Sequence, residues 1–239
     1  MKKGVKAQVA VFGSSGKMGK EIAEMLSLSS DLEPTLGISR EVPEEKNFLH
    51  HAGELKEKDF DKIQVLIDFS NAGAFSKALD LSLRKKIPFV SGTTGISEKQ
   101  KRDLIHAGKA IPVLWSPNMS LGIAALAKAT EALKTISKYD FQIEEVHHTR
   151  KKDSPSGTAL FLQNEVEKAI GKKLPPVLAI RGGGVFGEHE IRAYGENEII
   201  RFSHVALSRR LFAEGAVTAC RWILKQKKGL YQMKDVFQL

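Results

Sequence analysis

The chain has 239 residues, of which 42% are hydrophobic, enough for one large domain or two modest ones with a buried core. This composition excludes disordered and fibrous classes. Thirty-seven lysines and arginines against 28 aspartates and glutamates give a formal net charge of +9, which suggests an anionic partner. No stretch approaches the roughly 18 uninterrupted apolar residues of a membrane helix. The apolar run from Val9 to Phe12 is too short for an export signal, and the single cysteine, Cys220, excludes an internal disulfide. We therefore expect a cytoplasmic protein with no membrane partner.

In the first half of the chain, short apolar runs alternate with amphipathic stretches. The predicted strands are residues 8–12, 36–38, 65–70, 88–91 and 111–115. Helices are predicted between them, through Ile22 and Leu26, through Phe75 and Leu83, and over residues 98–107. Strand and helix in strict alternation indicate right-handed crossovers and a parallel sheet covered on both faces.

The pattern changes after Met119. One long helix is predicted over residues 120–136, and a second over residues 156–170. Strands are predicted at 140–147, 177–180, 189–194 and 199–207, the last two joined by a turn at residues 195–197, and a final helix at 211–226. The fold class is therefore α/β. We expect a Rossmann-type parallel sheet formed by residues 1–119 and 210–239, with an inserted α+β domain over residues 120–209.

A glycine-rich segment follows the first predicted strand and opens the first helix: Gly13-Ser14-Ser15-Gly16-Lys17-Met18-Gly19. Gly13 permits a tight turn, Gly16 lets a phosphate approach the backbone, and Gly19 allows close packing of the helix. The helix N-terminus offers free amides to a pyrophosphate. A structural turn can use the same residues, but the flanking strand and helix favour a dinucleotide site formed by Gly13 to Met18.

The end of the second predicted strand bears on the choice of dinucleotide. An acidic residue about 20 positions after the glycine loop normally holds the ribose hydroxyls of NAD. Here Ser39 leaves room for a 2′-phosphate, and Arg40 offers a guanidinium to pair with it. NADPH is therefore favoured. NADH remains possible if the strand ends later and Glu41 takes the acidic role.

Two loops follow the fourth and fifth predicted strands, at the carboxyl edge of the sheet, where ligands of such sheets bind. They contain Gly92, Thr93 and Thr94, and then Ser116-Pro117-Asn118-Met119. Small and hydroxyl-bearing residues suit close contact with a nicotinamide and its ribose. Ordinary turn chemistry explains these residues equally well when they are taken alone.

The segment from Glu144 to Thr158 concentrates histidines and cations at a strand end before a helix start. His147 titrates near neutral pH and can deliver a proton, and Lys151 can supply a proton or hold a developing negative charge. The helix start over residues 156–158 can bind a carboxylate. A solvated basic loop is the alternative. A zinc site is disfavoured, because adjacent histidines in a strand point opposite ways and no cysteine accompanies them, so we expect no metal.

With these motifs in order, the chain closely resembles the dihydrodipicolinate reductase (4-hydroxy-tetrahydrodipicolinate reductase) family. The resemblance is carried by Val9 to Gly19, Gly92-Thr93-Thr94-Gly95, Glu145-Val146-His147-His148 with Lys151, Ser154-Pro155-Ser156-Gly157-Thr158-Ala159, Phe186-Gly187-Glu188-His189, Phe212-Ala213-Glu214-Gly215-Ala216, and Gly229 to Val236. The segment from His147 to Thr158 is highly specific to the family, whereas the glycine loop is shared with many oxidoreductases.

The resemblance implies a homotetramer that reduces a small dicarboxylate with NAD(P)H in the diaminopimelate and lysine pathway. It also implies that His147 is the acid/base and Lys151 its partner. The substrate carboxylate is then held by His148, Lys151, Ser156, Gly157 and Thr158. Many members carry an acidic residue in place of Ser39, and Trp115 and Met119 also depart from the family pattern. Residues 41–61 match no motif.

Two other classes of protein would account for part of the sequence. A redox sensor of Rossmann type would bind NADPH without catalysis, but it leaves the histidine and lysine cluster unexplained. A nucleic-acid-binding protein would explain the charge of +9. The sequence shows no helix-turn-helix, zinc finger or basic strand studded with aromatic residues, so we expect no nucleic-acid partner.

Overall fold

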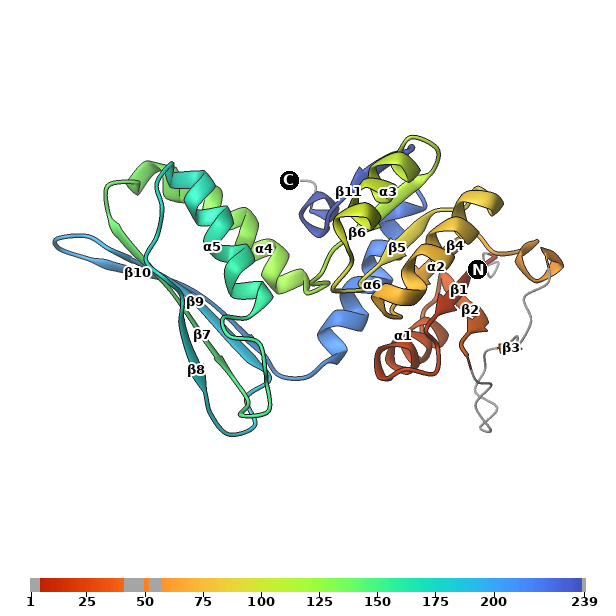
Figure 1. Ribbon diagram of the computed structural model, residues 1–239, viewed down its shortest axis with the longest axis horizontal. Helices are drawn as coiled ribbons and strands as arrows, with labels where there is room; N and C mark the ends of the chain where they lie inside the picture. Colours follow the sequence, from red (N-terminus) through yellow and green to blue (C-terminus); the bar gives the residue numbers. More distant parts are fainter. Residues whose placement is uncertain (1–4, 41–49, 52–56, 238–239) are drawn as a thin grey trace. The chain divides into compact units, whose positions relative to one another are not determined.

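The computed structural model describes residues 5–40, 50–51 and 57–237 (Figure 1). The chain divides into two compact units. The first unit is Met1–Met119 with Phe212–Leu239, and the second unit is Ser120–Leu211. The second unit is thus inserted into the first. No helix in the described ranges is both long and apolar enough to cross a membrane.

The first unit contains a parallel sheet, which confirms the predicted fold class. Its strands in the described ranges are β1 (Ala7–Phe12), β2 (Leu32–Ile38), β3 (His50–His51), β4 (Val65–Asp68), β5 (Phe89–Ser91), β6 (Pro112–Trp115) and β11 (Gly229–Tyr231). They lie in the order β11-β6-β5-β4-β1-β2-β3. The chain moves from β1 to β2 in one direction and from β4 through β5 to β6 in the other. The order therefore reverses between β1 and β4, and ligands of such sheets bind beside that switch point.

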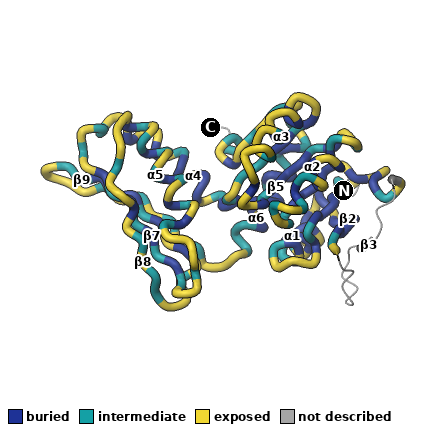
Figure 2. Tube along the Cα trace, in the orientation of Figure 1, coloured by how far each residue is buried: buried dark blue, intermediate teal, exposed yellow. Residues whose placement is uncertain are grey.

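The helices of the first unit form where apolar residues recur at helical spacing. They are α1 (Lys17–Ser27), α2 (Ala72–Lys85), α3 (Glu98–Gly108) and α6 (Arg210–Ile223), with short 3₁₀ turns η1 (Glu57–Phe60) and η3 (Met233–Val236). Asn71 caps α2, and Ser97 forms a capping box with Gln100 at the start of α3. Right-handed crossovers running in opposite directions place α1 on one face of the sheet and α2 and α3 on the other. The strands between them are buried along their length (Figure 2).

Three strands of the first unit differ from the sequence prediction, and one of them, β3, lies where no strand was predicted. β2 begins at Leu32 rather than at residue 36, and its pairing with β1 skips one residue between Pro34 and Leu36. Proline has no N–H to donate, so a strand accommodates it at such an irregularity. The short strand β11 was not predicted, since its three residues carry no apolar run and it forms by pairing with β6.

The second unit contains a mixed sheet of four strands in its described residues. These are β7 (Asp140–His147), β8 (Leu178–Arg181), β9 (Gly187–Tyr194) and β10 (Ile199–Ala206), in the order β10-β9-β7-β8. β8 runs parallel to β7, whereas β9 is antiparallel to both β7 and β10. The predicted hairpin is confirmed, with the Gly195 amide donating to the Glu198 carbonyl at 2.9 Å.

The helices of the second unit are α4 (Leu121–Ala129), the 3₁₀ segment η2 (Thr130–Ile136) and α5 (Gly157–Ile170). The prediction of one α-helix over residues 120–136 was therefore wrong beyond Ala129. The Thr130 hydroxyl donates to the Ala127 carbonyl three residues earlier, at 2.7 Å. Such a bond competes with the regular α-helical ladder and accompanies the tighter winding.

One face of the second sheet, the inner face, packs on these helices, and its character changes along β7. Phe141 and Ile143 lie in an apolar core with Leu162 and Val166 of α5. Two and four residues further along β7, the same face presents charged groups. Successive residues of a strand point to alternate faces, so these charged groups lie on the same face as the apolar core. This part of the inner face is called its polar end.

Candidate active site

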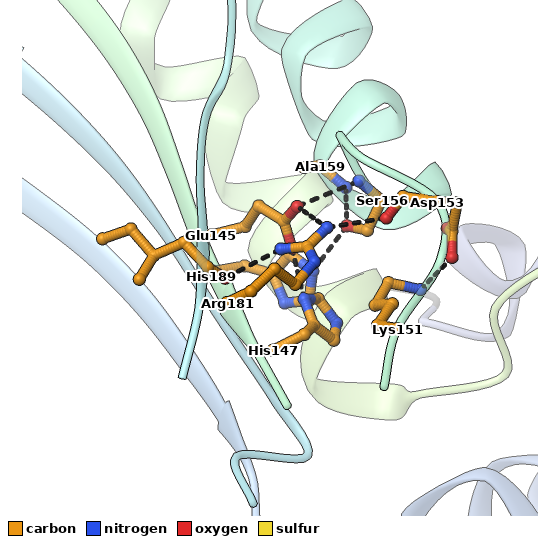
Figure 3. A network of polar contacts seen from close by, with 9 residues as sticks. Glu145, His147, Lys151, Asp153, Ser156, Ala159, Arg181 and His189 are labelled. Atoms are coloured by element: carbon orange, nitrogen blue, oxygen red, sulfur yellow. Dashed lines mark hydrogen bonds and ion pairs between the residues drawn. The ribbon is translucent and has the colours of Figure 1, made fainter. Parts of the chain in front are cut away.

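Four polar side chains meet at the polar end of the inner face (Figure 3). Glu145 and His147 lie two residues apart on β7, so both point to this face. In the strand register, His189 of β9 lies opposite Glu145, and Arg181 of β8 lies opposite His147. The sheet thus gathers one carboxylate, one guanidinium and two imidazoles in one buried place.

Glu145 is the centre of this group and is only 1% exposed. Its Oε1 accepts hydrogen bonds from Arg181 Nη2 at 2.9 Å and from the Ser156 amide at 3.1 Å. Its Oε2 contacts His147 Nδ1. Burial alone would raise the pKa of Glu145, but the bonds from Arg181 and Ser156 and the charge of His147 together lower it below its ordinary value. The carboxylate is therefore held ionised.

His147 is oriented by that carboxylate. With Nδ1 turned to Glu145, Nε2 is the nitrogen that remains to exchange a proton with a ligand. Burial lowers the pKa of His147, and the attraction of Glu145 only partly opposes this, while Lys151 and Arg181 lower it further. Gly187 makes room for the ring, because a Cβ there would lie 2.9 Å from His147 Nε2.

His189 and Ser156 connect the site to the start of α5. The Ser156 hydroxyl caps α5 by accepting from the Ala159 amide at 3.2 Å, and it lies 3.3 Å from His189 Nε2. Burial, helped by the charge of His147, lowers the pKa of His189 to about 4, so this imidazole is neutral near neutral pH. The ring centroids of His147 and His189 are 5.1 Å apart. His189 thus supports the site as a neutral hydrogen-bonding group.

The predicted substrate-binding residues lie around the same place within the second unit. Lys151 Nζ pairs with Asp153 Oδ1 at 2.9 Å (Figure 3). The amide and hydroxyl of Ser156 are engaged inside the protein, so α5 offers a ligand mainly its next residues. Gly157 faces open space, since nothing lies within 4 Å of the position of a Cβ there. The His148 amide donates to the Val185 carbonyl at 2.7 Å, which fixes the backbone at the end of β7. The assignment of His148, Lys151, Ser156, Gly157 and Thr158 to substrate stays a prediction.

A metal site is the alternative chemistry for this group. Glu145, His147 and His189 each bring a ligand atom within 4.8 Å of the other two. The second histidine of this group is not the adjacent His148 but His189, which lies on another strand and was not expected from the sequence. Both carboxylate oxygens of Glu145 are already engaged, and one is bound by a guanidinium that repels a cation. The contacts favour an internal ion-pair network over a metal centre.

The glycine loop of the first unit has the geometry that a dinucleotide requires. Gly13 has φ +86° and donates from its amide to the Ile38 carbonyl at 2.8 Å. A Cβ at Gly19 would lie 2.2 Å from the Gly13 carbonyl oxygen, so only glycine lets α1 start this close to the turn. Gly16 caps α1 without a side-chain hydrogen bond. The amides at the helix start are therefore suited to a pyrophosphate.

The other predicted cofactor residues fall at the same carboxyl edge or close to it. Ser39 and the exposed Arg40 directly follow β2, whose last carbonyl binds the glycine loop. Glu41 lies outside the described residues. Thr93 is buried after β5, and Met119 is only 1% exposed and lies where α6 approaches, since a Cβ at Gly215 would meet the Met119 carbonyl oxygen. The assignment of these residues and of Gly92, Thr94, Ser116, Pro117 and Asn118 to the cofactor stays a prediction.

Sequence reasoning assigned no role to Glu145, Arg181 or His189. The spacing of Glu145 and His147 was a usable signal, because residues two apart on a strand share a face. Arg181 and His189 carried no comparable signal, since the strand register that brings them to the site depends on how β8 and β9 pair with β7.

Comparison with known proteins identifies the family of this chain. Residues 7–119 match the family model described as dihydrodipicolinate reductase, N-terminus, and residues 119–237 match the model of its C-terminus. The 4-hydroxy-tetrahydrodipicolinate reductase of Bdellovibrio bacteriovorus is 46% identical over 231 residues, covering 97% of this chain and 96% of the relative. The enzyme of that name from Caldanaerobacter subterraneus is 35% identical over 248 residues, covering 96% and 97%.

A solved structure has the same fold. The dipicolinate-bound dihydrodipicolinate reductase from Paenisporosarcina sp. TG-14 matches with a TM-score of 0.84 at 19% identity, over 98% of this chain and 100% of that one. Its low identity supports the fold alone, whereas the family models and the relatives span both units. A nicotinamide cofactor follows from the Rossmann-type unit in a reductase family. The chain belongs to the dihydrodipicolinate reductase family.

Proposed function

We propose that this protein reduces 4-hydroxy-tetrahydrodipicolinate to tetrahydrodipicolinate in the diaminopimelate and lysine pathway, with NADPH preferred to NADH. The names of the similar reductases support the reaction. The observation that carries the proposal is the buried Glu145, which binds His147 on one oxygen and Arg181 on the other. This arrangement presents one defined imidazole nitrogen beside a cationic loop and a helix start.

The chain's own residues then orient the substrate and handle the proton. A bound reduced nicotinamide supplies the hydride, which is transferred to the unsaturated ring of the substrate. His147 delivers the proton from Nε2 while Glu145 stabilises the imidazolium form. Arg181 offsets the charge of Glu145, so the carboxylate stays ionised throughout.

Lys151 and the start of α5 bind the substrate carboxylate. The side chain of Lys151 is 21% exposed, and its ammonium is paired with Asp153, whose side chain is 59% exposed. An incoming carboxylate can displace such a solvent-facing partner at low cost, because exposed ion pairs contribute little. The amides near Gly157 and the positive end of the α5 dipole add a second contact.

The proposal is tested by following NADPH oxidation with the product of dihydrodipicolinate synthase, with NADH in parallel. We expect oxidation that depends on this product and is faster with NADPH. NADPH binding without turnover would instead support the redox sensor. DNA binding that is lost at modest salt concentration and shows no sequence preference would indicate nonspecific attraction between DNA and the net charge of +9.

Cofactor preference provides a further prediction. Ser39→Glu should shift selectivity towards NADH, because a carboxylate accepts bonds from the ribose hydroxyls and repels a 2′-phosphate. Arg40→Ala should lower kcat/KM for NADPH by about tenfold and change that for NADH much less, because charge-assisted bonds to the phosphate are lost. The preference should weaken as ionic strength rises, since Arg40 is exposed.

Arg102→Ala is the matched control, since Arg102 is also exposed but lies on α3. It should leave both cofactors unchanged. Equal use of both cofactors by the wild type, with no effect of Arg40→Ala on either, would show that the 2′-phosphate is not recognised at this position. Glu41 and nearby lysines would then be the next residues to vary.

Assembly is the second prediction drawn from the proposed function. The face of the second sheet that points away from its helices, the outer face, exposes large apolar side chains on β8 and β10: Leu178, Ile180, Ile199 and Val205, each more than half exposed. The same face carries Glu188 and Glu190 beside Arg192 and Arg201, so it can complement a second copy of itself. We expect this face to join the chains into a homotetramer.

Light scattering at micromolar concentration should give about four times the chain mass of 26.4 kDa. Ile180→Glu should lower that mass, because it replaces one of the exposed apolar side chains of the outer face by a charge. Leu160→Glu is the control, since Leu160 is 48% exposed but lies on α5. A monomer mass for the wild type would contradict the prediction.

A further inference from the structure

Asp68 stands at the carboxyl end of β4, beside the switch point of the parallel sheet, and is 0% exposed. Its Oδ1 accepts from the amide of Ser70 at 3.1 Å and from the hydroxyl of Ser70 at 2.5 Å. Its Oδ2 accepts from the hydroxyls of Ser91 and Thr93, each at 2.8 Å. A buried carboxylate therefore has four donors on it, although it faces no solvent and can contact no ligand.

The direction of these bonds is set by the backbone. The Thr93 hydroxyl oxygen accepts from the Ser70 amide at 3.1 Å, and the Ser91 hydroxyl oxygen accepts from the Thr93 amide at 3.2 Å. Each hydroxyl oxygen already accepts one bond, so its proton is available to Asp68. Both oxygens of Asp68 thus act as acceptors, as the ionised form requires.

These bonds fasten the loops that follow neighbouring strands. Ser70 belongs to the loop after β4, and Thr93 to the loop after β5. The next strand joins them, because Trp115 Nε1 donates to the Thr93 carbonyl at 3.0 Å. Phe69 packs closely against both Gly92 and Gly13. A Cβ at Gly92 would lie 2.4 Å from the Phe69 ring, and a Cβ at Gly13 would lie 2.6 Å from the Phe69 carbonyl oxygen.

We propose that Asp68 is a positioning residue for the nicotinamide half of the cofactor site. This inference rests on the proposed function, in which the loop that contains Thr93 and Thr94 binds the nicotinamide and its ribose. Asp68 holds that loop in the conformation that binds them. The glycine loop is held differently, by bonds from the amides of Gly13 and Ser14 to the Ile38 carbonyl. The adenine and phosphate half of the site should therefore depend on Asp68 less than the nicotinamide half does.

Asp68→Asn tests this, because the amide keeps the size of the side chain but turns two acceptor positions into donors. Calorimetry should show that it weakens NADP⁺ binding by about tenfold or more. Binding of 2′-phospho-ADP-ribose, which lacks the nicotinamide, should stay within about twofold of the wild type. Ser91→Ala removes one donor and should show the same selectivity with a smaller loss of about threefold. It carries the test if Asp68→Asn does not fold.

The control is Asp80→Asn, the same exchange at an exposed position on α2, which should change neither affinity. Equal weakening of NADP⁺ and the fragment would mean that Asp68 only maintains the fold, and would overturn the inference. Unchanged NADP⁺ binding in both variants would overturn it as well. A wild-type protein that binds no NADP⁺ would instead contradict the proposed function on which the inference rests.

Discussion

Replacement of His147 by alanine is expected to lower kcat by about 10²-fold or more, the usual scale for the loss of a positioned general acid. The reason is that Glu145 holds His147 with one nitrogen engaged, which leaves Nε2 to deliver the proton. His189 is already bonded to Ser156 and has a pKa lowered to about 4 by burial. Steady-state kinetics with saturating NADPH measures the effect.

Lys151→Ala should produce a loss of similar size, because it removes the cation that holds the substrate carboxylate and the charge developing beside it. NADPH binding should survive in both variants, since neither residue belongs to the glycine loop. His106→Ala and Lys152→Ala, at exposed positions, are the matched controls and should retain normal turnover. Near-normal turnover in the His147 and Lys151 variants would refute their assignment.

Glu145→Gln is expected to lower kcat/KM by about 10²-fold, because the amide no longer fixes the His147 tautomer or stabilises the imidazolium. The pH profile should change as well. In the wild type, kcat/KM should fall as pH rises through the pKa of His147, which lies below its ordinary value. Glu145 raises that pKa, so its loss should move this limb of the profile to still lower pH.

The matched control for this variant is Glu144→Gln. Glu144 is the preceding residue on β7, points to the opposite face and pairs with Arg192. It should leave both the rate and the pH profile unchanged. A Glu145→Gln enzyme with an unaltered profile would show that the carboxylate does not act through His147, even if its rate were lower.

Much of the fold could be predicted from local pattern. The glycine loop, the alternation of strands and helices, and the boundaries of β7 over residues 140–147 follow from periodicity and turn residues. The 3₁₀ segment after Ala129 could not be predicted, because its apolar spacing is that of an α-helix and a single threonine bond accompanies the change. The short strand β11 likewise depends on its partner β6.

Some residues of the site could likewise be predicted from the sequence, and others could not. His147 and Lys151 could be named because their residue types carry the chemistry and their segment is specific to the family. Glu145 could have been added from its spacing to His147 alone. The roles of Arg181 and Asp68 could not be predicted, because they depend on contacts between strands. In the sequence, Asp68 is indistinguishable from an ordinary polar residue at the end of a strand. Long-range pairing is the information that local patterns lack.

Hydride transfer from a nicotinamide to the substrate can be followed with an isotope label. NADPH carrying deuterium at both positions of the nicotinamide C4 is supplied with the product of dihydrodipicolinate synthase. Mass spectrometry of the tetrahydrodipicolinate formed should show one deuterium in each product molecule. Product without deuterium, or NADPH that is consumed without reduction of the substrate, would contradict the account.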